Sequence, residues 1–196
     1  MSEMFRFKNE FAGRADSEHE QAFLRVVIVS FFAFQMYLFV GPREGWTEVE
    51  RTLSTGLFGF LLIAIGIFAA IYLWPAKSVA RRIAGMLADV GFATFYVWLA
   101  GENGAFMIVI YLFVTLGNGF RYGRRYIFAC QAMSIIGFGA AGFFVPYWQE
   151  HHTTWLAFLS AIFILPLYVS ALLKRIELAR DHAKEALKEC LERNAT

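Results

Sequence analysis

The residues best suited to chemistry form a dense polar cluster at residues 13–21, directly before the first long apolar run. The cluster reads Gly-Arg-Ala-Asp-Ser-Glu-His-Glu-Gln, so basic, acidic, hydroxyl and imidazole groups lie within one short segment. Such groups can receive a polar ligand. The rest of the sequence contains no Gly-rich phosphate loop, nucleophile elbow or HExxH sequence. The cluster therefore predicts a receiving site more than a reacting one.

A simpler role for the same cluster is to begin a helix. Ser17 and Glu20 have the spacing of a capping box, and acidic side chains suit the positive end of a helix. A cap accounts for most of these residue types. It leaves His19, Gln21 and Arg14 unexplained, because one helix end does not need so many polar groups.

The elements that must position this cluster are apolar. Of the 196 residues, 58% are hydrophobic, which is more than a soluble domain needs. Crossing a bilayer takes roughly 20 apolar residues. Six apolar runs lie at residues 23–40, 53–74, 83–100, 105–116, 126–147 and 155–173. Their short connections favour antiparallel neighbours. The sequence predicts an all-α, polytopic transmembrane helix bundle of six spans.

The fourth run is the weakest span. Twelve residues give only ~18 Å of helix, against a hydrocarbon core of ~30 Å. Either the helix continues through Gly117-Asn118-Gly119, or the run is a broken segment that faces a cavity. If it does not span, five crossings remain and the N-terminus moves outside.

Charge predicts the orientation of the bundle. All basic residues except Arg43 and Arg51 fall on one side of the predicted spans, which places both termini in the cytoplasm and favours an even number of spans. The net charge of +2 gives no signal for nucleic-acid binding. Cys130 lies in an apolar run and Cys190 in the polar tail, so we expect no disulfide. No cleavable signal peptide is evident.

The C-terminal tail is rich in helix-forming residues. Leu172, Ile176, Ala179, Ala183, Ala186 and Cys190 recur at the spacing of a coiled-coil seam. We expect a homodimer through this helix. The predicted organisation is a juxtamembrane sensor segment at 1–22, a transmembrane input bundle at 23–173 and a cytoplasmic coiled-coil signalling helix at 174–196.

The cluster at 13–21 resembles the input module of RpfC-type sensor histidine kinases, which detect diffusible signal factor, a cis-2-unsaturated fatty acid of bacterial quorum sensing. The run Gly-Asn-Gly-Phe-Arg-Tyr-Gly at 117–123 is similar to a cytoplasmic loop of the same modules. The resemblance covers the whole chain. It implies a sensory input module in the bacterial inner membrane, with a fatty-acid signal as ligand. It also implies that Asp16, Ser17 and Glu18 sense the signal, with Arg14 and Glu20 beside them.

The sequence lacks a Ser-His-Glu phospho-acceptor box, an ATP-binding domain and a receiver domain. His182 is followed by Ala183 and Lys184, so we expect it to be a surface residue. This chain alone is therefore not expected to be an enzyme, and it would reach a response regulator only through a kinase core that it lacks. It is either an excised module or a stand-alone relative, and the helical end of the tail favours excision.

A fatty-acid carboxylate prefers arginine, lysine or helix N-termini, whereas Asp16 and Glu18 would repel it. We therefore hypothesise that these acidic residues pair with basic groups that the ligand takes over. Arg14, Arg25 or Arg121 would then hold the ligand carboxylate, with the acyl chain in an aromatic groove.

Asp89 is a second candidate, because an ionisable group inside a membrane is costly and should be paired. Its expected partners are Arg121, Arg124 and Arg25, and a purely structural ion pair is the alternative. Asn118 and Arg121 join the candidate set from the second motif, although Arg121 also suits contact with anionic membrane lipids.

Two other classes of function stay open. A small transporter would need paired half-helices and inverted repeats, and a membrane-bound lipid enzyme would need a polar catalytic cluster near the interface. We expect no cofactor and no metal, because the adjacent side chains of His151 and His152 point apart on most backbones.

Overall fold

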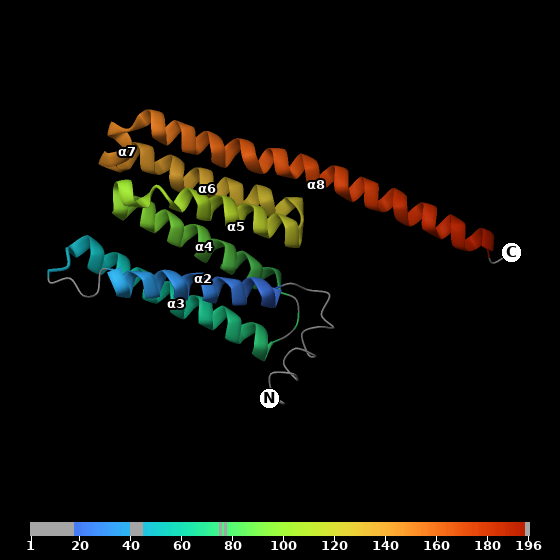
Figure 1. Cartoon of the computed structure of the whole chain (residues 1–196), viewed down its shortest axis with the longest axis horizontal. Coiled ribbons are helices and arrows are strands. Elements are labelled where there is room, and N and C mark those ends of the chain that lie inside the picture. Colours follow the sequence, from blue (N-terminus) through green and yellow to red (C-terminus); the bar gives the residue numbers. More distant parts are fainter. Residues whose placement is uncertain (1–17, 40–44, 75, 77, 195–196) are drawn as a thin grey trace. The chain divides into compact units, whose positions relative to one another are not determined.

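The structure is a computed structural model that describes residues 18–39, 45–74, 76 and 78–194 (Figure 1). Every regular element among these residues is helical, so the all-α prediction is confirmed. The elements are α2 (Glu18–Phe39), α3 (Glu48–Leu73), α4 (Val79–Ala100), a 3-10 turn η1 (Gly101–Gly104), α5 (Met107–Tyr122), α6 (Arg124–Phe144), α7 (Pro146–Glu150) and α8 (His152–Asn194).

Five of the described helices are long and apolar enough to cross a membrane, namely α2, α3, α4, α6 and the first part of α8. This makes the chain a multi-pass membrane protein. The sixth apolar helix, α5, continues through Gly117-Asn118-Gly119, as the first of the two alternatives for the fourth run predicts. Its 16 residues still give only ~24 Å of helix.

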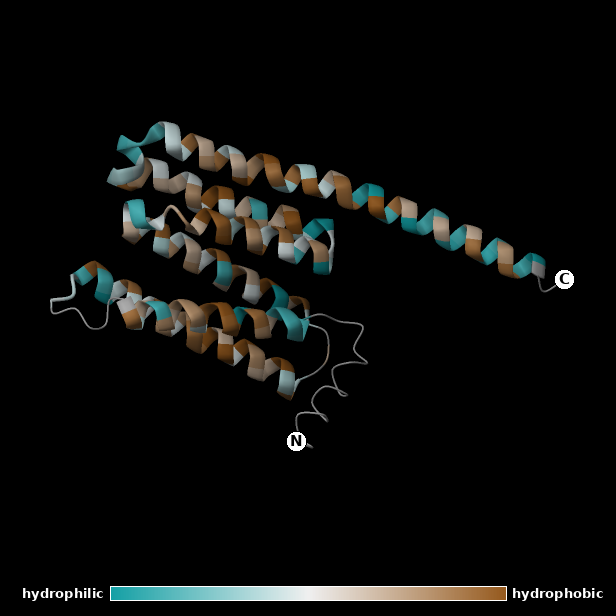
Figure 2. Cartoon of the chain, in the orientation of Figure 1, coloured by the Kyte–Doolittle hydropathy of each residue, from teal (hydrophilic) through white to brown (hydrophobic). Residues whose placement is uncertain are grey.

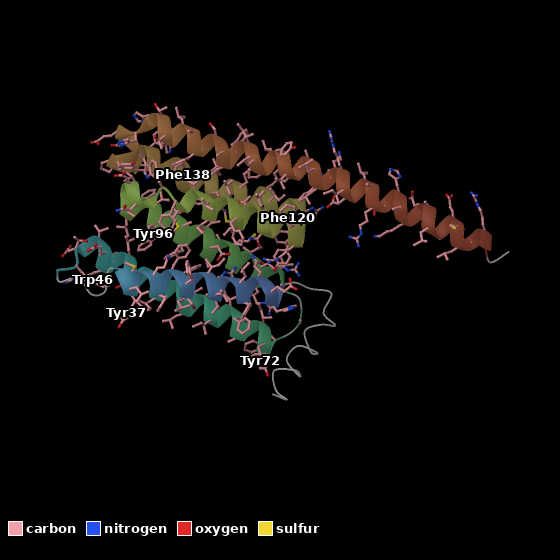
Figure 3. The ribbon with its side chains drawn as sticks, in the orientation of Figure 1. Tyr37, Trp46, Tyr72, Tyr96, Phe120 and Phe138 are labelled. Carbon is pink, nitrogen blue, oxygen red and sulfur yellow. The ribbon has the colours of Figure 1, made fainter. Side chains whose placement is uncertain are left out.

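The helices form two compact units, divided between Gly104 and Ala105. In the first unit, α3 packs against both α2 and α4. Thr47 and Glu50 begin α3 with a reciprocal capping box. The core of this unit contains Val29, Ala33, Leu57 and Phe60, with Ala88 and Phe92 of α4 packed against it. Figure 3 shows the side chains of Tyr37 and Tyr72 pointing away from these helices.

In the second unit, α5, α6 and α8 all pack against one another. Gly123 makes the tight turn between α5 and α6 with φ +93°, a conformation that glycine adopts without strain. One turn earlier, a Cβ on Gly119 would come within 2.0 Å of Ile127, so the second sequence motif serves close packing of α5 on α6. Phe138 is fully buried among these helices (Figure 3), against the rings of Tyr111 and Trp148.

Helix α8 contains Pro166, which lacks the N–H that would bond to the carbonyl of Ile162. The side-chain amide of Gln131, on α6, compensates for this loss. Its Nε2 donates to the carbonyl oxygens of Ile162, at 3.4 Å, and Phe163, at 2.7 Å. A buried carbonyl therefore keeps a partner where the helix cannot supply one.

Helix α8 runs without a break across the predicted boundary between residues 173 and 174. Figure 2 shows hydrophobic residues along its first part and mixed, mainly hydrophilic residues along the rest. The later part carries exposed pairs of opposite charge one turn apart, such as Lys188 with Glu192. The described part of the tail, from Lys174 to Asn194, is thus helical, while the three predicted domain boundaries stay predictions.

Candidate functional site

The first part of the candidate site is a buried ion pair between α2 and α4. The guanidinium of Arg25 donates from Nε to Oδ1 of Asp89 at 2.5 Å and from Nη2 to Oδ2 at 2.7 Å. The side chains are only 6% and 10% exposed. Of the three partners predicted for Asp89, the structure shows Arg25. The planar guanidinium matches both carboxylate oxygens, which fixes the geometry as well as the charge.

A glycine on α4 makes room for this pair. Gly85 lies one turn before Asp89, and a Cβ at Gly85 would stand 2.8 Å from Nη2 of Arg25. The same Nη2 atom donates to Asp89. An alanine here would therefore push against the guanidinium in the position that the ion pair requires.

The second part of the site holds the first residue of α2. Glu18 is 5% exposed, and its two carboxylate oxygens bind different guanidinium groups. Oε2 accepts from Arg81 Nη2 at 2.5 Å and from Arg81 Nε at 3.2 Å. Oε1 accepts from Arg82 Nε. Both arginines lie in the first turns of α4, so Glu18 ties the start of α2 to the start of α4.

Arg81 is also anchored to the connection between α3 and α4. Its Nη1 donates to the carbonyl oxygen of Trp74 and its Nη2 to that of Ala76, both at 2.9 Å. Ser78 caps α4 by accepting a hydrogen bond from the backbone N–H of Arg81. Backbone contacts therefore hold this guanidinium in place independently of Glu18.

The Arg25–Asp89 pair and the contacts of Glu18 with Arg81 and Arg82 fix the register of α2 against α4. Near the helix starts, the acidic group (Glu18) is on α2 and the basic groups are on α4. About two turns further on, the basic group (Arg25) is on α2 and the acidic group (Asp89) is on α4, so the two helices run in the same direction. Sliding α2 by two turns would bring Glu18 to Asp89, or Arg25 to Arg81. Both juxtapositions are repulsive, so the opposite order of charges specifies one alignment.

The other described sequence candidates take no part in these ion pairs. Glu20 is exposed on α2. On α5 of the second unit, Asn118 is fully buried and donates from Nδ2 to the carbonyl oxygen of Val114 at 2.8 Å, while Arg121 is half-buried. Arg124, another expected partner of Asp89, donates from Nε to Oγ of Ser170.

Three candidates, Arg14, Asp16 and Ser17, lie outside the described residues, as does the predicted Ser17 capping box. Within the part of the chain that the structure describes, no group of three or more His, Cys, Asp and Glu side chains is placed to hold a metal ion.

Sequence reasoning missed Arg81 and Arg82 as site residues, because it counted them only as signals of membrane orientation. One signal was available. Basic residues are unfavourable in the first turn of a helix, where the helix dipole is positive, unless a carboxylate accompanies them. Placing them at the start of α4 therefore implied an acidic partner from another element.

The comparisons with known proteins agree with the resemblance. No protein-family model matches the chain, and no solved structure matches it. Two curated relatives, from two strains of Xanthomonas campestris pv. campestris, are both named Sensory/regulatory protein RpfC and are 33% identical over 181 residues. The match covers 91% of this chain and 24% of each relative, so the chain spans about a quarter of their length. The predicted resemblance is therefore confirmed, since along almost its whole length this chain is similar to about a quarter of the RpfC sequence.

Proposed function

We propose that this chain is the sensory input module of a two-component sensor histidine kinase, and that it detects a fatty acid of the diffusible-signal-factor type. The observation that carries the proposal is the match of 91% of the chain to a protein named Sensory/regulatory protein RpfC. The kinase activity, the quorum-sensing role and the fatty-acid ligand come from the family resemblance, and the relatives are about four times longer than this chain.

The proposed location is the bacterial inner membrane, with both termini in the cytoplasm. The distribution of basic residues supports this orientation, since Arg81, Arg82, Arg121 and the α8 tail all belong to one predicted side. It requires α5 to cross as a sixth span. Labelling of a cysteine introduced at residue 2 in intact cells tests the orientation, because a membrane-impermeant thiol reagent reaches only an external site.

The proposed sensing residues are Asp16, Ser17 and Glu18, with Arg14 and Glu20 beside them. Glu18 supports this role by its contacts, because its carboxylate joins the polar cluster to the start of α4. A ligand that changes the cluster would therefore also change how α2 is held against α4.

The proposed output is α8. Its residues from 174 to 194 continue the helix of the apolar segment without interruption, so a rotation or shift of that segment is transmitted ~30 Å along the axis. We propose that two copies pair through this helix, along the seam that includes Ile176, Ala183 and Cys190. A kinase core beyond the seam would then act on a response regulator.

The test joins this chain, through α8, to the catalytic core of a well-behaved histidine kinase in continuous heptad register. Autophosphorylation is measured in proteoliposomes with and without a cis-2-unsaturated fatty acid, and a saturated acid of equal length is the control. We expect the unsaturated acid to change the rate more than the saturated acid. A fusion whose rate ignores both acids, in vesicles that show solute flux through this chain, would contradict the sensor and favour a transporter.

A further inference from the structure

The Glu18 carboxylate is held as a bound ligand would be held. Two guanidinium groups on α4 converge on it from different residues, and each carboxylate oxygen has its own donor. Charge-assisted hydrogen bonds of this kind recognise the planar carboxylate and not the chain behind it. The same donors therefore suit the carboxylate of a free fatty acid.

The site would persist when Glu18 leaves it. Arg81 keeps its two backbone carbonyl partners, from Trp74 and Ala76, because neither belongs to α2. A guanidinium anchored in this way presents its remaining donors without reorganising first. Such preorganisation lowers the free-energy cost of binding.

An apolar row on α4 begins beside the same arginines. Val79, Ile83 and Leu87 follow one another at one-turn spacing and are 61%, 43% and 55% exposed. At 3.6 residues per turn, Arg82 lies between this row and the face that carries Arg81, Gly85 and Asp89 toward α2. The row spans ~12 Å along the helix axis, of which ~7.5 Å lies beyond the level of Arg82. A carboxylate at Arg82 thus has an apolar track for its acyl chain.

Arg25 is a poorer site for the ligand carboxylate. Its Nε and Nη2 atoms donate to the two carboxylate oxygens of Asp89 in a buried pair. A ligand that displaced Asp89 would leave the Asp89 carboxylate without its counter-ion inside the bundle. Glu18, by contrast, is the first residue of α2, so the release of its carboxylate does not leave a charge in the interior of the helix bundle.

We propose that Arg81 and Arg82 form a fatty-acid carboxylate site that Glu18 occupies in this structure, with the acyl chain along Val79, Ile83 and Leu87. The ligand replaces the Glu18 side chain and thereby releases the start of α2 from α4. This inference rests on the proposed function, since it names the binding site for the proposed signal.

The resident carboxylate lowers the apparent affinity for the free acid. A ligand that binds only after Glu18 has left the site has its apparent affinity multiplied by the fraction of molecules in which the site is vacant. If Glu18 occupies the site in about nine molecules of ten, binding is weakened by about tenfold. Glu18→Gln keeps the shape and removes the charge, and we expect it to tighten binding about tenfold. Arg82→Gln removes a charge-assisted bond, and we expect it to weaken binding by about tenfold or more.

The experiment measures saturable binding of a radiolabelled cis-2-unsaturated fatty acid to the full chain in phosphatidylcholine nanodiscs, with binding to empty nanodiscs subtracted. The methyl ester of the same acid is the first control. Arg51→Gln, an exposed arginine at the start of α3, is the matched control variant. We expect the ester to bind at least about tenfold more weakly and Arg51→Gln to bind like the unmodified chain. The Glu18→Gln/Arg82→Gln double variant should lose the tightening.

Several results would overturn the site: equal binding of acid and ester, no change in Glu18→Gln, or displacement of the acid by phosphatidylglycerol at the same concentration as by unlabelled acid. If Arg82→Gln does not reconstitute as a helical protein, the ester and the isosteric Glu18→Gln variant still decide. Acid binding that depends on Arg82, with a kinase fusion that ignores the acid, would sustain the site and refute the sensor. A kinase fusion that responds to the acid, together with normal acid binding by Arg82→Gln, would sustain the sensor and refute the site.

Discussion

The buried pair of Arg25 and Asp89 predicts a large and non-additive effect on stability. Asp89→Asn removes one charge at nearly constant volume and takes the Asp89 carboxylate away from a buried guanidinium. The pair contains two hydrogen bonds, at 2.5 and 2.7 Å. The asparagine oxygen can still accept one of these bonds, so the lost bond alone contributes about 1.5–3 kcal/mol. Breaking buried ion pairs in general costs about 3–5 kcal/mol.

The lower end of this range is the appropriate expectation for a membrane protein. Polar groups in the membrane-embedded unfolded state also find partners, so measured hydrogen-bond contributions there average only about 0.6 kcal/mol. We therefore expect Asp89→Asn to destabilise the chain by about 3 kcal/mol. Reversible unfolding in mixed micelles of a mild detergent and dodecyl sulfate, followed by circular dichroism, measures this difference.

The double variant Arg25→Met/Asp89→Leu, measured beside its single variants Arg25→Met and Asp89→Leu, gives a double-mutant cycle. It removes both charges and fills the space with apolar groups, so we expect stability within about 1 kcal/mol of the unmodified chain, or above it. Glu102→Gln is the control, because Glu102 is an exposed carboxylate just after α4, and surface changes of this kind stay within about 0.5 kcal/mol. A loss below about 1 kcal/mol for Asp89→Asn, or additive losses in the double variant, would show that the pair is solvated and refute the reasoning.

Three further predictions follow from packing and exposure. Gly85→Ala should destabilise the chain by about 1–3 kcal/mol, because the new methyl group crowds the Arg25 guanidinium. Gly91→Ala, on the same helix with open space around it, should be neutral or should stabilise the chain by up to about 1 kcal/mol. Chemical unfolding of both variants measures the difference. Gln131→Leu should cost about 1–3 kcal/mol, because it removes the side-chain donor of the buried Ile162 carbonyl. The same unfolding measurement would contradict this by showing no loss. Cys190 is exposed and Cys130 is buried, so mild oxidation should link two chains through Cys190 if the predicted seam pairs; a non-reducing gel without dimer, or with equal dimer in Cys190→Ser, would count against that seam.

Much of the helical framework was predictable from sequence, because the apolar runs are long and their period is helical. The run at 105–116 left two alternatives open, and its length alone could not decide between them. The structure shows the first alternative, since α5 continues to Tyr122 through two glycines. Gly119 is compatible with the helix because Ile127 packs where its side chain would be. That contact joins residues on two helices, and sequence spacing does not reveal it.

The candidate site was only partly predictable for the same reason. The burial expected for Asp89 predicted a basic partner, and three arginines were candidates. The structure shows that Arg25 is a partner. The Glu18 contacts with Arg81 and Arg82 depend on α2 and α4 running in the same direction with α3 packed against both. The role of Gln131 as a hydrogen-bond donor to α8 could not be predicted from the sequence, because it depends on which carbonyl oxygens of α8 its side chain reaches.

The two ion pairs also limit what kind of movement a ligand can produce. Displacing Glu18 breaks the link at the start of α2 but leaves Arg25 bound to Asp89 about two turns further along. A slide of α2 would break both links and bring like charges together, so release at the start favours a pivot about the Arg25 level. Moving such an equilibrium from 1:99 to 99:1 requires a difference in binding free energy of about 5.5 kcal/mol between the two states. One carboxylate exchanged for another contributes little to that difference. Most of it must come from the acyl chain on the apolar row of α4, and signal strength should therefore rise with chain length at constant head group.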